Sequence, residues 1–231
     1  MIGIIGAMDE EVAKVKEQME DVSVVQKASM DFYKGTLKGV PVVVVRSGIG
    51  KVNAALCTQI LVDTFQVSSV INTGIAGSLR AEINIGDIVL CTDALEHDMD
   101  AVAFGYPVGQ IPRMDTLSFE ADEKLRTVAK AACEKVLPEI GVFEGRVVTG
   151  DQFVSSAQKK DWLFETFAGY CTEMEGAAIA HAAYVNDIPF LIIRAISDKA
   201  DNSASMDYPA FEAMAIDNSV KLLMEMVTNL A

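Results

Sequence analysis

Acidic side chains stand at three places in the sequence where a bound molecule could reach them. Glu11 comes just after the apolar run Ile2–Met8, and Glu175 begins an alanine-rich segment. Asp198 closes another apolar run, which also contains Arg194. Ligands of open α/β sheets bind outside the carboxyl ends of the strands, so residues that end apolar runs are the first candidates for a site. Carboxylates in such places can exchange protons with a reacting group.

Each of these residues also has a purely structural interpretation. The acidic run Asp9–Glu11 would complement the N-terminal dipole of a following helix, and Glu175 could do the same at its own helix. Arg194 and Asp198 could form a salt bridge. Taken together, these residues favour a functional site, because a charged group such as Arg194 inside a buried strand needs an oppositely charged partner or a functional role. The acidic run also argues against a dinucleotide site, which would place a phosphate at this helix start.

Two stretches of small residues would let a ligand approach the main chain closely. Ser47–Lys51 contains two glycines, which permit a tight turn before a helix. Asn72–Ser78 follows an apolar run and consists mostly of small side chains. Ser47–Lys51 is a weak signal by itself, because glycine-rich turns between strands and helices are common, whereas Asn72–Ser78 fits a ligand site as well as it fits a structural role.

The elements that must position these residues follow an α/β alternation. Val- and Ile-rich runs without polar alternation predict strands that are buried on both faces: Ile2–Met8, Val40–Arg46, Ser69–Thr73, Asp87–Thr92, Gly145–Gly150 and Phe190–Ile196. Helical periodicity predicts helices at Glu10–Met19, Val52–Phe65, Ala121–Val136, Gln158–Phe167, Glu175–Asn186 and Pro209–Leu230. Strand-like Val22–Gln26 and Phe32–Leu37 add an antiparallel part. We therefore predict a single α/β domain over residues 1–231, a three-layer sandwich whose central sheet is mixed, mostly parallel and flanked by helices.

Composition restricts the partners. The 231 residues carry a formal net charge of −14, which repels nucleic-acid backbones, and no apolar run approaches the length of a membrane span. The four cysteines show no paired spacing and only two histidines accompany them, so neither a metal site nor a disulfide framework is indicated. Met1 runs directly into an apolar segment that reads as a core strand, so we expect a cytoplasmic protein.

The long segment His97–Ser118 has no predicted helix or strand. It carries more apolar side chains than a solvated loop needs, among them Phe104 and Pro112. Loops of this length are usually functional or covered by a partner, so we predict an interface or a pocket lid. The two histidines, His97 and His181, lack ligand spacing and are more typical of structural roles, although His97 begins this loop.

Several of these stretches recur together in one known family. They are Gly3–Met8 with Glu11, Ser47–Lys51, Asn72–Gly77, Thr149–Asp151 with Phe153, Glu173–Glu175, and Arg194–Asp198. In this order and spacing, from Met1 to the last helix, the chain resembles the 5′-methylthioadenosine/S-adenosylhomocysteine nucleosidases of the purine nucleoside phosphorylase superfamily. The resemblance implies a nucleoside phosphorylase-like fold, cleavage of the bond between adenine and ribose, and no metal or organic cofactor.

The resemblance also implies roles for individual residues. Glu11 would activate the attacking water, Asp198 would protonate or hydrogen-bond adenine N7, and Glu175 would hold the ribose hydroxyls. At the base, the Val154 main chain would meet the adenine edge and Phe153 would stack on the ring. Met174 would lie near the ribose, and Met8, Ile49 and Tyr208 would lie at the alkylthio end. The resemblance also places four further residues in the substrate site: Glu173, Ile75, Ser197 and Arg194. Family members are usually homodimers, so Phe104 and Pro112 would reach into the neighbour's pocket.

The chemistry of the bond fits these roles. Breaking an N-glycosidic bond builds positive charge on the ribose and negative charge on the departing purine, so an acid at the base, an anion near the sugar and a positioned water are needed. Phosphorolysis is the nearest alternative. Phosphorylase relatives commonly have an arginine at the position of Asn72, and the acidic run Asp9–Glu11 would repel phosphate, so hydrolysis is favoured. A non-catalytic adenosine sensor would not need all three carboxylates.

One position departs from the family pattern. Many of these nucleosidases have serine at the position of Ile75, close to the water and the ribose hydroxyls, so one hydroxyl contact is missing and main-chain N–H groups of the same stretch would have to serve. The residues do not choose among methylthioadenosine, S-adenosylhomocysteine, 5′-deoxyadenosine and aminodeoxyfutalosine, because an adaptable apolar pocket meets the 5′ group.

Overall fold

The computed structural model describes residues 1–230 and contains one mixed sheet of ten strands. The strands are β1 (Ile2–Gly6), β2 (Glu20–Lys27), β3 (Met30–Leu37), β4 (Val40–Arg46), β5 (Ser69–Ser78), β6 (Ile88–Glu96), β7 (Phe119–Glu120), β8 (Val142–Thr149), β9 (Cys171–Glu173) and β10 (Phe190–Asp198). The helices are α1 (Asp9–Lys16), α2 (Lys51–Phe65), α3 (Glu123–Val136), α4 (Ala157–Phe167), α5 (Gly176–Val185) and α6 (Ala204–Thr228), with a 3₁₀ turn at Val102–Phe104.

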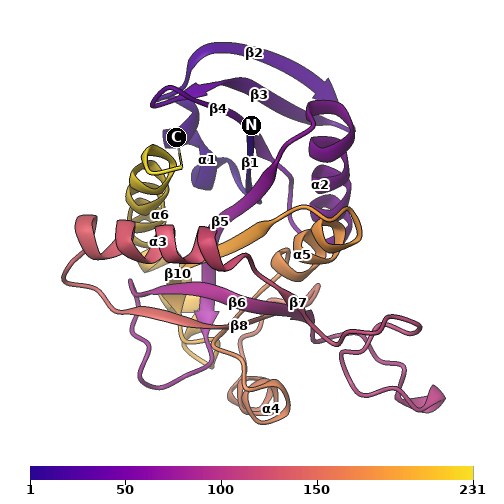
Figure 1. Cartoon of the computed structure of the whole chain (residues 1–231). Coiled ribbons are helices and arrows are strands. Elements are labelled where there is room, and N and C mark those ends of the chain that lie inside the picture. Colours follow the sequence, from indigo (N-terminus) through magenta and orange to yellow (C-terminus); the bar gives the residue numbers. More distant parts are fainter. Residues whose placement is uncertain (231) are drawn as a thin grey trace.

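Helices cover both faces of the sheet (Figure 1). Helices α2 and α5 pack together on one side, and α1, α3 and α6 pack on the other. The strands between them are almost wholly buried: every residue of β1, β5 and β10 is buried. Apolar runs without alternation produce this arrangement, because both faces of each strand meet helices. The predicted fold class, a mixed α/β sandwich with a central sheet flanked by helices, is confirmed.

Strand β5 lies at the centre and gives the sheet its shape. It runs parallel to β1 on one side and to β10 on the other, and at Gly77 and Ser78 it pairs with antiparallel β9. Since β10 continues through β6 and β8 back to β9, these five strands close into a ring. At the opposite edge, β2, β3 and β4 form the antiparallel part that the sequence predicts.

Some element boundaries differ from the predictions. Strand β5 continues through Gly74 to Ser78, so most of the stretch expected as a turn after Thr73 is strand. Helix α6 begins at Ala204, five residues before Pro209, so this proline lies inside the helix, where it cannot donate the usual main-chain hydrogen bond. The short strands β7 and β9 were not predicted, since two or three residues carry no periodicity.

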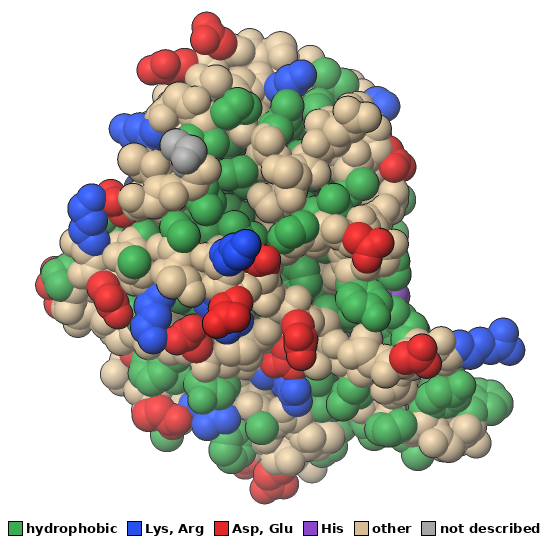
Figure 2. Space-filling view, in the orientation of Figure 1, with side chains coloured by type: hydrophobic (Ala, Val, Ile, Leu, Met, Phe, Trp, Pro, Cys, Tyr) green, Lys and Arg blue, Asp and Glu red, His purple; other side chains and the backbone are tan. Residues whose placement is uncertain are grey.

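The segment between β6 and β7 protrudes from the body, and apart from the 3₁₀ turn it is irregular (Figure 1). Hydrophobic side chains gather on this protrusion in the space-filling view (Figure 2). Phe104 at its tip is 84% exposed. Across residues 1–230, no helix combines the length and apolarity needed to cross a membrane.

Candidate active site

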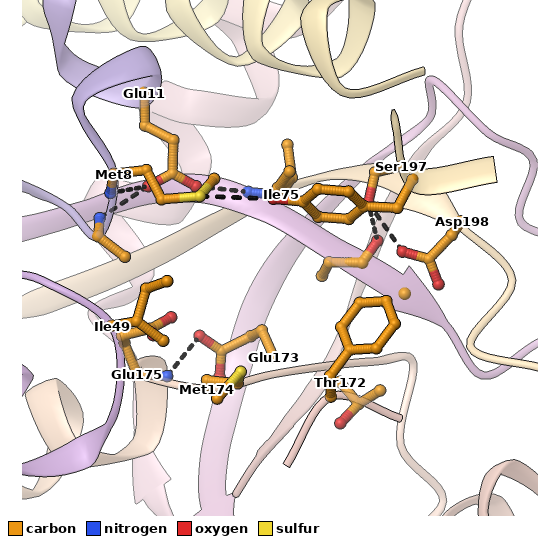
Figure 3. A pocket seen from close by; sticks show the side chains of 15 residues that line it. Met8, Glu11, Ile49, Ile75, Thr172, Glu173, Met174, Glu175, Ser197 and Asp198 are labelled. Atoms are coloured by element: carbon orange, nitrogen blue, oxygen red, sulfur yellow. Dashed lines mark hydrogen bonds between the residues drawn. The ribbon is translucent and has the colours of Figure 1, made fainter. Parts of the chain in front are cut away.

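A cavity of about 350 Å³ lies at the carboxyl ends of β1, β5 and β10 (Figure 3). This position is the one expected for ligands of an α/β sheet, and the volume suits a small ligand. Most of the cavity wall is apolar, and its ionisable side chains are the carboxyls of four acidic residues and the hydroxyl of Tyr208. The lining residues are Ala7, Met8, Glu11, Ile49, Ile75, Ala76, Gly77, Phe153, Thr172, Glu173, Met174, Glu175, Ser197, Asp198 and Tyr208.

Glu11 points into this cavity from the first turn of α1 and is held there by three main-chain donors. Its Oε2 accepts from the N–H groups of Ala7 at 2.7 Å and Met8 at 3.0 Å, and its Oε1 accepts from that of Ile75 at 3.2 Å. Burial raises the pKa of the carboxyl, while Arg194 and these donors act in the opposite direction. The helix-start interpretation is therefore correct but incomplete, because the same carboxylate reaches across to β5.

Glu175 precedes α5, yet its carboxylate does not cap that helix. Glu173 Oε2 accepts from the N–H groups of Glu175 and Gly176 at 3.1 and 2.7 Å, and Thr149 Oγ1 accepts from Ala177 at 2.8 Å. With the helix start satisfied by these neighbours, Glu175 turns to the cavity and accepts from Gly50 N–H at 2.8 Å. Burial and the neighbouring Glu173 raise the pKa of Glu175.

Arg194 is buried behind these carboxylates with 2% of its surface exposed. Its Nη2 donates to Glu173 Oε2 at 2.5 Å and to Asn72 Oδ1. The salt bridge considered between Arg194 and Asp198 is not formed, since Glu173 takes the guanidinium. The positive charge of Arg194 thus offsets the acidic groups gathered at one end of the cavity, which burial alone would force to stay protonated.

Asp198 occupies the other end of the cavity (Figure 3). Its Oδ1 accepts from Ala200 N–H at 2.7 Å, and its Oδ2 accepts from the hydroxyl of Ser197 at 2.9 Å. Burial is the largest influence on this carboxyl and raises its pKa, although both donors lower it. A buried carboxyl with a raised pKa can hold a proton at a pH where an ordinary aspartate has lost it.

Two glycines of β5 make room for the two end carboxylates. A Cβ at Gly74 would lie 2.6 Å from Glu11 Oε1, and a Cβ at Gly77 would lie 2.7 Å from Asp198 Oδ1. The two glycines are three positions apart, which is roughly 10 Å along an extended strand. The small side chains of β5 therefore let two carboxylates meet one strand at separate points, with space between them for a ligand.

Comparison with known proteins assigns this geometry to a family. The family model of the Phosphorylase superfamily matches residues 1–228. The 5′-methylthioadenosine/S-adenosylhomocysteine nucleosidase of Staphylococcus carnosus is 41% identical over 231 residues, and the match covers 100% of both chains. The chain belongs to the 5′-methylthioadenosine/S-adenosylhomocysteine nucleosidases.

Solved structures agree with this assignment. The nucleosidase from Neisseria meningitidis, in complex with methylthio-immucillin-A, is 38% identical, with a TM-score of 0.95 and coverage of 99% of this chain and 98% of that one. The futalosine hydrolase of Helicobacter pylori is 34% identical, with a TM-score of 0.93 and coverage of 99% and 97%. Relatives of this nucleosidase are thus known under two hydrolase names.

Most residues that the resemblance placed in the nucleosidase site do line the cavity. Met8, Ile49 and Tyr208 stand together with Phe153 on its apolar side, where the Tyr208 hydroxyl contacts Met8 Sδ at 3.4 Å and the Phe153 ring meets the Tyr208 ring edge-on. Phe153 is 52% exposed, so this side of the cavity is open.

Four predicted residues lie elsewhere. Arg194 is behind the wall. Val154 is buried and lines a small adjoining cavity that Phe153 and Asp198 also line, so the contact of its main chain with the adenine edge stays a prediction. Phe104 and Pro112 belong to the protruding loop and do not line this chain's own cavity. The structure adds Ala7, Ala76, Gly77 and Thr172. Ala76 and Gly77 belong to the stretch of small residues that the sequence indicates for ligand approach, and Ala7 lies in the first apolar run, whereas Thr172 has no distinctive sequence signal.

The histidines and the position of Asn72 are separate from the cavity. His97 is buried, and within residues 1–230 neither ring nitrogen has a hydrogen-bond partner. His181 stacks on Phe119 with ring centroids 4.8 Å apart. Asn72 bonds Arg194 and the Ile5 carbonyl inside the core. Among the described residues, no cluster of three or more His, Cys, Asp or Glu side chains is arranged to hold a metal ion.

Proposed function

We propose that residues 1–231 form a single nucleosidase domain that hydrolyses the N-glycosidic bond of 5′-methylthioadenosine and S-adenosylhomocysteine, releasing adenine and the thioribose product. The observation that carries the proposal is the gathering of Glu11, Glu175 and Asp198 around one largely apolar cavity. The names of the relatives support the substrate class. An apolar wall of Met, Ile, Phe and Tyr suits a purine and an alkylthio group.

Asp198 acts as the acid at adenine N7 in this proposal. Its pKa is raised by burial, so it can carry the proton that the departing purine needs. The Ser197 hydroxyl and the Ala200 N–H then stabilise the carboxylate left after the transfer. Because both donors come from the same strand end, the acid is fixed in one orientation.

Glu11 activates the water, and Glu175 holds the ribose hydroxyls. A raised pKa makes Glu11 the stronger proton acceptor, and three main-chain donors fix its two oxygens. The negative charge of both glutamates also faces the positive charge that develops on the ribose. Ile75 donates its main-chain N–H to Glu11 Oε1 but has no side-chain hydroxyl to make the contact that a serine would make.

Water is favoured over phosphate by the charges on the cavity wall. None of the described residues that line the cavity is Lys or Arg. Arg194 lies behind the wall and is already bonded to Glu173 and Asn72. A phosphate dianion needs converging cationic donors, whereas this wall presents carboxylates.

Asp198→Asn tests the assignment of the acid. Asparagine keeps the shape but carries no acidic proton, so kcat for methylthioadenosine should fall by about 100-fold or more, the size of a general-acid contribution. The matched control is Asp201→Asn, which changes an aspartate three residues away that does not line the cavity and should keep near-normal kcat. Near-normal turnover by Asp198→Asn would assign the acid to another residue.

We further propose that the nucleosidase works as a homodimer in the cytoplasm. The exposed Phe104 of the protruding loop would enter the pocket of a second copy together with Pro112. All four cysteines are free and buried, which suits a reducing compartment. Cell fractionation would test the location; recovery with secreted or envelope proteins would contradict it.

A further inference from the structure

The first residues of α2 have no cap of their own. Gly50 precedes the helix with φ of 95° and offers no side chain, and the first turn of this described helix holds no acidic residue. Helix starts leave N–H groups without intrahelical partners. Here two carboxylates from distant parts of the chain accept them: Gly50 N–H donates to Glu175 Oε1 at 2.8 Å, and Lys51 N–H donates to Asp151 Oδ1 at 2.9 Å.

The Lys51 side chain closes this arrangement into a ring. Its Nζ donates to Asp98 Oδ1 at 2.7 Å and to Glu96 Oε2 at 3.0 Å. The second oxygen of Asp98 accepts from Asp151 N–H at 3.0 Å. Lys51, Asp98 and Asp151 are therefore joined in a closed set of three bonds, which we call the Lys51 ring.

The Lys51 ring ties two segments that border the cavity to the base of the protruding loop. Lys51 begins α2, directly after Ile49 and Gly50. Asp98 begins the protruding loop, and Asp151 begins the stretch that carries Phe153. The segments that carry Ile49 at the 5′ end and Phe153 at the adenine base thus meet the base of the protruding loop at a single cation.

Lys51 is well placed to hold this junction. Its side chain and that of Asp98 are each 19% exposed, and that of Glu96 is 10% exposed. Burial opposes ionisation of Asp98, but the bonds from Lys51 and from Asp151 N–H outweigh it and lower the pKa of Asp98. Without the cation, the carboxylates of Glu96 and Asp98, which are largely shielded from water, would repel one another next to the start of α2.

We propose that Lys51 is a positioning residue for ribose recognition: through the Lys51 ring it holds Gly50 N–H where Glu175 receives it, and so fixes the carboxylate on the ribose hydroxyls. This inference rests on the proposed function of Glu175. A displaced Gly50 would free Glu175 to rotate, and small displacements of a binding group can lower rates by about 100-fold.

The test uses the substrate as the second partner of a double-mutant cycle. The values of kcat/KM are measured for Lys51→Met, Glu175→Gln and the unchanged protein on methylthioadenosine and on its 3′-deoxy analogue. If Lys51 acts through Glu175, Lys51→Met should lower kcat/KM on methylthioadenosine about 10- to 100-fold. On the 3′-deoxy analogue, which lacks the 3′-hydroxyl that Glu175 would bind, the loss should be only a few-fold. Lys51→Arg, which keeps a cation with several donors, should restore most of the loss.

The controls separate three explanations. Lys16→Met removes a lysine of matching exposure, 18%, that pairs with Asp9 at 3.7 Å away from the Lys51 ring, and should change both substrates equally little. Equal losses for Lys51→Met on both substrates would overturn the inference. Equal losses for Glu175→Gln on both would instead contradict the proposed role of Glu175. If Lys51→Met does not fold, Asp98→Ala opens the same ring from the loop side, and the same comparison decides.

Discussion

The acidic side chains of the site are buried, and burial disfavours their ionised forms. Burial is the largest influence on the pKa of Glu11, Glu175 and Asp198, and it raises all three. Such a group binds its proton more tightly in the folded chain than in the unfolded chain. It therefore contributes stability below the ordinary carboxyl pKa and loses that contribution as pH rises through the folded pKa.

Glu175→Gln should for this reason stabilise the protein while it damages catalysis. The amide oxygen can still accept from Gly50 N–H, but the substitution removes a buried charge beside Glu173. The ordinary glutamate pKa is 4.5, so we expect little gain at pH 4.5 and a growing gain above it. At pH 9 the Tm should rise by at least about 2 °C. A Tm that falls equally at both pH values would contradict the proposed cost of burying this carboxylate.

The sequence predicts the three carboxylates but not their mutual support. Glu11 follows an apolar run, Glu175 begins an alanine-rich segment and Asp198 closes an apolar run, so their places at the ends of elements can be read from hydropathy. The partner of Arg194 cannot, because Glu173 and Arg194 come together only when β9 and β10 are both placed. The capping of α5 by Glu173 and Thr149, which frees Glu175, is likewise a contact through space.

At the scale of elements, β5 is the strand on which the site depends. It is hydrogen-bonded to β1, β10 and β9, so it cannot shift to accommodate a larger side chain. The carboxylates of Glu11 and Asp198 approach it over Gly74 and Gly77. A small residue at each of these two points is thus required by the site and not by a turn.

Gly77→Ala should separate folding from catalysis. The new methyl group would lie 2.7 Å from Asp198 Oδ1 and 2.8 Å from Ala200 Cβ, and the β5 backbone is held on both sides. Asp198 must move, so we expect kcat to fall by about 100-fold with the far-ultraviolet circular dichroism unchanged. Full activity in Gly77→Ala would show that the acid does not sit over this glycine.

The sequence predicts strands correctly where a long, unbroken run of apolar residues is buried on both faces. The runs at Ile2–Met8, Val40–Arg46 and Phe190–Ile196 become β1, β4 and β10, since strands buried on both faces leave an unbroken apolar signature. The prediction fails after Thr73, at residues 74–78, because glycine and alanine in a strand resemble the composition of a turn. The pairing of β5 with β9 at Gly77 and Ser78 shows that the end of this stretch is strand.

At the scale of the whole molecule, the proposed dimer completes each 5′ pocket with the protruding loop of the other chain. Phe104→Ala should raise KM for methylthioadenosine, because the partner's 5′ pocket loses an aromatic wall, while inhibition by free adenine, which has no 5′ group, stays the same. Light scattering on the unchanged protein should give the mass of two chains. A monomer at assay concentrations, or an unaltered KM, would remove Phe104 and Pro112 from the site.

The charge of the whole molecule agrees with the choice of nucleophile. A net charge of −14 and a cavity wall of carboxylates both disfavour phosphate, and the cation nearest to the wall is already paired with Glu173. Hydrolysis thus follows from the field of the protein as well as from the residues Glu11 and Asp198.

The most direct measurement is product analysis of methylthioadenosine turnover with and without phosphate. Purified protein in phosphate-free buffer should release adenine and free methylthioribose, identified by mass, and added phosphate should leave the rate and the products unchanged. Turnover that requires phosphate, or the appearance of methylthioribose 1-phosphate, would contradict the account.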